Sequence, residues 1–211
     1  MPATSTPVAS WMALAIGALE PGDAAALLRS AGPGAALRLA TMRTLAGLPA
    51  AEEPAHAAQE PAPLPRLAAS LGAAPLLGSP AELPQTAELV RVGSRVRVYV
   101  VAPGPASQVR PILMRRSERG SVRLLPIEGA PWPTLDRFQR EDDVHVIDLV
   151  VGEPIGLQTL VLGLLDADVV EDPWPAGDAR DARVMEAVLN GGIPGAVLSL
   201  QVIGEGASPR G

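Results

Sequence analysis

Short runs of β-branched and apolar residues fill the second half of the chain, each ended by glycine, proline or acidic residues. The runs cover residues 95–101, 109–115, 121–126, 144–151, 157–165 and 196–203. Several short strands separated by turn signals are typical of a sandwich or barrel. The sequence therefore predicts a mainly β fold, an antiparallel β-sandwich over residues 88–205.

Alternation within these runs indicates which face each strand buries. The three valines between residues 96 and 100 alternate with Arg95, Arg97 and Tyr99, the pattern of a half-buried antiparallel strand. The runs at 109–115 and 121–126 flank a turn at residues 118–120 and predict a hairpin. The two most apolar runs, 144–151 and 157–165, are predicted to be central strands, and residues 182–189 are predicted to form one late helix.

The first 48 residues carry helical signals instead. Ser10 and Asp23 are suitable helix caps, and they predict helices over 10–19 and 23–30, with a third over 35–48 after a glycine-proline break. An apolar stripe at helical spacing runs along the third helix: Leu37, Thr41, Leu45 and Leu48. We expect a small helical unit whose stripe packs on the protein's own β domain, with an external partner as the alternative.

Proline is dense between the helical unit and the β-rich part. Residues 49–87 contain prolines at 49, 54, 61, 63, 65, 75, 80 and 84. Because proline breaks helices and removes backbone donors, most of this stretch is predicted to be an extended linker. One short helix is expected at residues 66–71, or else this weakly apolar segment docks on the sheet. Residues 206–211 are expected to be a disordered tail.

Composition excludes several classes of function. The chain has no cysteine, which removes disulfides, thiolate metal sites and cysteine nucleophiles. Only 2% of residues are aromatic, which argues against a stacking platform for single-stranded nucleic acid. The apolar stretch at residues 8–19 is too short to span a bilayer and has no basic residue before it. We therefore expect a soluble, cytoplasmic protein without a membrane segment.

Charge is distributed unevenly along the β-rich part. Residues 88–125 hold eight arginines and two glutamates, a net +6, whereas residues 126–186 hold four arginines and fourteen acids, a net −10. The predicted binding residues come from the basic part: Arg91, Arg95, Arg97, Tyr99, Arg115 and Arg123. These arginines either pair with the protein's own carboxylates, the interpretation we favour, or receive a protein partner. Nucleic acid is disfavoured because the whole chain carries −6.

Residues for catalysis or metal binding are sparse. His56 lies in the proline-rich stretch, and His145 lies near Asp142, Asp143 and Asp148. Strand alternation places His145 and Asp148 on opposite faces, which disfavours a metal site. The acidic residues between 166 and 181 lack the register of a calcium-binding loop and are predicted to be solvated. We expect no enzyme activity, no catalytic residues, no metal and no cofactor.

Three segments resemble a known family. The order of "VRVYVV", "GSVRLLP" and "GEPIGLQTLVLGLL" within residues 88–165 is similar to a bacterial β-sandwich domain of unknown function that is often appended to caspase-like peptidases or protein kinases. The matching positions are Leu124-Leu125-Pro126 and Pro154-Ile155-Gly156, and Leu125 stands where the family usually has an aromatic residue. The resemblance implies an accessory, non-catalytic module, with a caspase-like peptidase or a kinase as the partner.

The sequence as a whole predicts a non-catalytic protein-binding or accessory module. It would bind its partner through the arginine-bearing strands or through the N-terminal helical stripe. Two alternatives remain open at this point: a metal-dependent enzyme or regulator centred on His145, and a structural subunit of a homo-oligomer.

Overall fold

A computed structural model describes residues 8–49, 66–69, 88–170, 172–174 and 178–204. Its helices are α1 (Val8–Ala15), α2 (Pro21–Ala31), α3 (Ala35–Leu45) and α4 (Asp178–Leu189). Its strands are β1 (Arg66–Ala69), β2 (Glu88–Arg91), β3 (Arg95–Val100), β4 (Val109–Ser117), β5 (Gly120–Leu125), β6 (Gln139–Glu141), β7 (Val144–Val150), β8 (Gly156–Asp166) and β9 (Gly195–Ile203). None of the described helices is long and apolar enough to cross a membrane.

The described strands form two sheets. One has four antiparallel strands in the order β1-β3-β7-β6, and the other has five in the order β2-β9-β8-β4-β5. In the larger sheet β2 runs parallel to β9, whereas its other pairs are antiparallel. The predicted, purely antiparallel arrangement is therefore wrong at β2. With roughly 32% helix and 36% strand, the fold is mixed α/β rather than mainly β.

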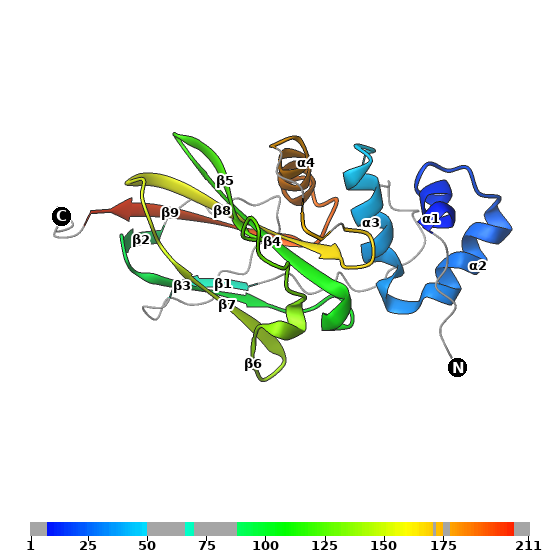
Figure 1. Ribbon diagram of the computed structural model, residues 1–211, viewed down its shortest axis with the longest axis horizontal. Coiled ribbons are helices and arrows are strands. Elements are labelled where there is room, and N and C mark those ends of the chain that lie inside the picture. The colour runs from blue at the N-terminus through cyan, green and yellow to red at the C-terminus, as the bar shows by residue number, and fades with distance from the viewer. Residues whose placement is uncertain (1–7, 50–65, 70–87, 171, 175–177, 205–211) are drawn as a thin grey trace.

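The two sheets face each other across one hydrophobic core, and helices cover the outer face of the larger sheet (Figure 1). Inward-facing residues come from both sheets: Val96, Val98, Val100 and Ile147 from the smaller one, and Leu113, Leu160, Leu162, Leu164, Leu198 and Leu200 from the larger one. Helices α3 and α4 contact β8 from the other side. The order of layers is thus helices, five-stranded sheet, four-stranded sheet.

Helix α4 packs on the five-stranded sheet at two glycines. Gly163 of β8 and Gly195 of β9 are paired in register. A Cβ on Gly195 would lie 2.4 Å from the carbonyl oxygen of Leu162 and 2.7 Å from a methyl group of Val188 in α4. A Cβ on Gly163 would lie 3.1 Å from another methyl group of Val188. The missing side chains therefore let Val188 of α4 approach the sheet backbone.

Most of the predicted elements are present, with some corrections. Residues 66–69 form strand β1 beside β3, not a helix, so this segment docks on the sheet as the alternative proposed. Strands β2 and β6 were not predicted, and β7 and β8 are interior strands of different sheets. The rest of the proline-rich stretch and the tail at 206–211 lie outside the described residues.

The helical stripe of α3 packs on the protein itself. Leu37 is part of the core between the sheets, and Leu45 packs on the core under α4. Thr41 is fully buried, and Leu48 packs on a small core formed by the helices. The stripe therefore has its partner within the chain, as the favoured interpretation expected.

We predict that Gly195→Ala destabilises the fold. The new Cβ meets a backbone oxygen as well as Val188, so α4 or β9 has to move, and overpacking of this kind costs about 1–3 kcal/mol. Urea unfolding followed by circular dichroism measures the change. The control is Gly22→Ala in α2, where a Cβ meets nothing within 4 Å and alanine is the better helix former. Equal stability of Gly195→Ala and the natural protein would contradict this packing.

Candidate functional site

The predicted binding residues of β3 lie on the outer face of the four-stranded sheet, away from the core between the sheets. Arg95, Arg97 and Tyr99 point outward because the valines between them fill the core. Nε of Arg97 donates to Asp148 at 3.2 Å, and its Nη1 donates to Glu141 at 3.2 Å. A hydrogen bond with Tyr99, followed by these two carboxylates, raises the pKa of the Arg97 guanidinium. The charge of Arg97 is thus balanced within its own sheet.

The other predicted binding residues lie elsewhere. Arg123 of β5 faces the helix-covered side, where its Nη1 is 3.2 Å from both carboxylate oxygens of Asp181 in α4. Arg115 of β4 donates to the backbone oxygen of Glu153 at 2.6 Å. Arg91 is exposed at the edge strand β2. The structure therefore does not gather the six predicted residues into one surface.

Ion pairs connect the basic and the acidic part of the chain. An arginine from residues 88–125 meets an acid from residues 126–186 in four of them: Arg97–Glu141, Arg97–Asp148, Arg110–Asp172 and Arg123–Asp181. In the described parts of the chain, these pairs engage three of the eight arginines and four of the fourteen acids, so the charge asymmetry is used inside the protein only in part. The prediction of a solvated acidic loop at 166–181 is wrong for Asp166, which is buried beside Arg38, and for the half-buried Asp181, which pairs with Arg123. Asp172 is exposed to solvent, although it pairs with Arg110.

His145 lies on the inward face of β7, opposite Val100 of β3. Asp148 is exposed on the other face of the same strand, as alternation predicted. Asp143 forms an ion pair with Arg140, whose Nη2 lies 3.3 Å from Oδ1 of the carboxylate. In the described parts of the chain, no three histidine or acidic side chains come together in a way that could hold a metal ion. His56 lies outside those parts.

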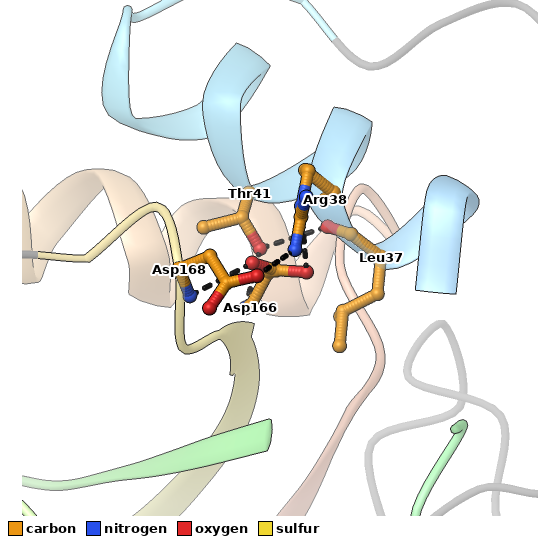
Figure 2. Close-up of polar contacts among 5 residues, drawn as sticks. All are labelled: Leu37, Arg38, Thr41, Asp166 and Asp168. Atoms are coloured by element: carbon orange, nitrogen blue, oxygen red, sulfur yellow. Dashed lines mark hydrogen bonds and ion pairs between the residues drawn. The ribbon is translucent and has the colours of Figure 1, made fainter. Parts of the chain in front are cut away.

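A polar cluster joins the N-terminal helices to the end of β8 (Figure 2). We call it the α3 clasp; it consists of Arg38 and Thr41 of α3 with Asp166 and Asp168. Nε of Arg38 lies 3.2 Å from Asp166, and the same guanidinium contacts Asp168. The backbone N–H of Asp166 donates to Thr41 Oγ1 at 3.0 Å, and Thr41 donates to the backbone oxygen of Leu37 at 2.8 Å. The clasp fixes where α3 sits on the sheet.

The electrostatics of the clasp are dominated by burial. The Asp166 carboxylate is almost fully buried, and this desolvation raises its pKa above the ordinary 3.8, against the opposing effect of Arg38. Arg38 also stacks over the ring of Trp11 at 5.6 Å, which brings α1 into the same contact. Sequence analysis missed the clasp because Arg38 and Asp166 are 128 residues apart. The only local signal was Thr41, a polar residue inside an apolar stripe.

A groove of about 780 Å³ runs between α4 and the β4–β5 hairpin. We call it the α4 groove. Its apolar lining includes Met114 of β4 and Met185 and Leu189 of α4. Its exposed charged residues include Arg116 and Glu186. Figure 1 shows α4 above the five-stranded sheet, to which β5 belongs. Sequence analysis missed this groove because its two walls come from segments about 60 residues apart.

A second hollow, of about 490 Å³, lies between α3 and α4. Arg183 of α4 reaches toward α3 there and donates to the backbone oxygen of Leu45 at 2.9 Å. The Arg183 side chain therefore links α4 to α3 along this hollow. We regard it as a seam between packed helices.

Comparison with known proteins adds no family. No protein-family model matches the chain, and no curated protein matches it at a significant level.

We predict that the α3 clasp makes stability depend on pH through Asp166. Its pKa is raised in the folded state, so above the ordinary pKa the folded protein keeps a proton that the unfolded chain has released. This contribution to stability is present at low pH and is lost as the pH rises through the folded-state pKa. The free energy of unfolding of the natural protein, minus that of Asp166→Asn, should therefore fall as the pH rises above the ordinary pKa of 3.8. Urea unfolding at intervals of pH above this value measures it. A difference that rises with pH would contradict the assignment.

We predict that Arg123→Ala lowers the free energy of unfolding by about 1–3 kcal/mol, because it leaves the half-buried Asp181 without its cation. Asp181 then keeps the indole N–H of Trp174 as a donor, at 2.8 Å. The matched control is Arg116→Ala on the neighbouring strand, whose exposed side chain should change stability by less than about 0.5 kcal/mol. Urea unfolding compares the two variants. If both lose the same small amount, the Arg123–Asp181 pair does not stabilise the fold.

Proposed function

We propose that this chain is a non-catalytic protein-binding module that takes a peptide segment of a partner into the α4 groove. One observation carries the proposal: a groove whose lining combines accessible apolar side chains, Leu189 and Val122, with exposed charges, next to an edge strand. Binding pockets for peptides combine apolar anchoring positions with a few polar groups that set orientation. The α4 groove offers both within one volume of about 780 Å³.

The groove fits a binding role better than the surfaces expected from sequence. Arg97 and Arg123 already hold carboxylates of the protein itself, so a partner would have to displace those pairs. The stripe of α3 is likewise occupied by the sheet and by the small helical core. Arg116 differs from these arginines because it is exposed at the groove.

The side chains that line the groove favour a protein segment as the ligand. Leu189 is half-buried and Val122 is 50% exposed, so the groove offers accessible apolar surface beside the buried Met114 and Met185. Arg116 and Glu186 carry opposite charges, so a segment with an apolar centre and flanking charged residues complements the lining. Strand β5 is an edge strand, and no other described strand pairs with its outer side, so its backbone also has groups to offer.

The proposed role is accessory, and no chemistry is assigned to the module. The buried Nδ1 of His145 has no hydrogen-bond partner among the described residues, so no carboxylate orients this ring as a general base. The resemblance of residues 88–165 to a domain appended to caspase-like peptidases or kinases supports a module that recruits such a protein. That partner class stays a prediction.

The experiment is a selection of random peptides displayed on phage against the immobilised chain. We expect enriched peptides with an apolar centre, and we expect Leu189→Glu to weaken their Kd at least about tenfold in fluorescence anisotropy. Arg116→Glu, which changes an exposed residue, should weaken peptides that carry an acidic flank.

The matched control is Val150→Glu, an exposed apolar position on the four-stranded sheet, which should leave the Kd unchanged. Circular dichroism confirms that each variant is folded. The proposal fails if no peptide is enriched, or if the groove variants and the control bind the enriched peptides equally well.

A further inference from the structure

The α4 groove reaches the outer edge of β5. Consecutive residues of a strand point to opposite faces, so a groove that lies over one face meets only every second residue. Along β4 the lining follows this rule, because it includes Met114 and Arg116 and omits Arg115 between them. Along β5 it includes four consecutive residues: Gly120, Ser121, Val122 and Arg123. The groove therefore borders the edge of this strand, where residues of both orientations are accessible.

This edge of β5 offers backbone groups. Strand β5 is the last strand of the five-stranded sheet, and no other described strand pairs with its outer side. In an antiparallel pair only alternate residues exchange hydrogen bonds with the neighbouring strand. The residues between them direct their backbone N–H and C=O groups away from β4. Gly120, Ser121 and Val122 are exposed, so a ligand in the groove has access to these groups.

Residues 120–123 also lack the common protections of an edge strand. Natural proteins protect such edges with very short strands, proline, outward charges or a bulge. The edge strands β1, β2 and β6 have three or four residues each, whereas β5 has six. Residues 120–123 contain no proline and pair with β4 in continuous register, because the shift in register lies beyond them. Their one charged side chain, Arg123, is turned toward Asp181.

We infer that the partner segment binds in an extended conformation, as an added strand beside residues 120–123. The inference rests on the proposed function, because it states how the α4 groove holds its peptide. Backbone hydrogen bonds to an edge strand supply affinity, and pockets for alternate side chains supply specificity. Every second side chain of the segment points to the side of the sheet on which Met185 and Leu189 line the groove.

The dimensions of the groove suit a short strand. Four residues of a strand span roughly 13 Å. The lining residues of α4 lie between Asp181 and Asn190, and a helical stretch of this length rises roughly 14 Å. An extended segment of about four residues therefore matches both walls. A helical segment uses its own backbone groups internally and leaves the edge of β5 unpaired.

A second copy of the chain fits this edge less well than a partner segment does. Residues 115–123 hold four arginines and one glutamate, a net +3. Two copies that pair β5 with β5 would set these like charges against each other, which destabilises a strand pair. A segment with an acidic residue near the hairpin meets the exposed Arg116 and Arg119 instead. We therefore expect an acidic residue beside the apolar centre of the segment.

Backbone methylation of an enriched peptide tests the inference. A methyl group on one amide nitrogen at a time removes one N–H donor and leaves every side chain in place. We expect methylation of every second central residue to weaken the Kd at least about fivefold in fluorescence anisotropy, because an N–H that donates to β5 is lost. The residues between them point their N–H away from β5, so the Kd should change less than about twofold. Equal effects at all positions, or effects spaced by three or four residues, overturn the inference.

Hydrogen exchange measures the same contact on the natural chain. Saturating peptide should slow the exchange of alternate amides within residues 120–123. The control is β2, the edge strand at the other end of the same sheet, whose amides should exchange as before. Unchanged exchange in β5 with the peptide bound contradicts the added strand. Protection of these amides in the free protein that grows with protein concentration also contradicts it, because it indicates pairing of two copies.

The outcomes separate this inference from the proposed function. A peptide that is weakened by Leu189→Glu but by no backbone methylation keeps the α4 groove as the binding site and removes the added strand. A selection that enriches no peptide removes both.

Discussion

Burial of β8 on both faces is the constraint on which the rest of the structure depends. Its inward leucines at 160, 162 and 164 pack on the four-stranded sheet, while Val161 and Leu165 pack under α4. A strand that is apolar on both faces needs a layer on each side, and full burial of each such side chain contributes about 1.5–3 kcal/mol. The three layers of the fold follow from this requirement.

The polar contacts contribute less to stability than hydrophobic burial does, and their main effect is on the placement of the elements. Exposed ion pairs such as Arg97–Asp148 contribute little to stability. The pair of Arg38 with the buried Asp166 pays a desolvation cost that hydrophobic residues would avoid. The pair instead fixes the position of α3. Asp166 ends β8, and α3 supplies the Arg38 guanidinium to its carboxylate and the Thr41 hydroxyl to its backbone N–H. The clasp thus selects one placement of α3 on the sheet.

The sequence predicted what depends on local pattern. Alternation predicted the half-buried strand β3, and the apolar run of β8 predicted a central strand. The turn at 118–120 predicted the hairpin. Strands β1, β2 and β6 have three or four residues each, too few to show a period. The parallel pairing of β2 with β9 joins segments more than 100 residues apart, and no local pattern encodes its direction.

The candidate site shows the same division between local and distant information. Alternation correctly placed Arg95, Arg97 and Tyr99 on an outer face, but it carried no information about the carboxylates that Arg97 would meet. Arg123 was assigned to a shared arginine face, whereas the fold turns it toward α4 and Asp181. Gly163 and Gly195 let α4 lie close to the sheet, and the α4 groove lies between this helix and the β4–β5 hairpin. Its location is a product of tertiary packing.

The rule that explains β8 also bears on α1. Both segments are apolar without a polar face, and such segments need cover on two sides. For β8 the chain supplies both covers, one from the opposite sheet and one from the helices. For α1 the chain supplies one, through Trp11 and Ala15, and the side formed by Val8, Met12 and Ile16 faces outward. Among the described residues, α1 therefore has cover on one side, whereas β8 has cover on both.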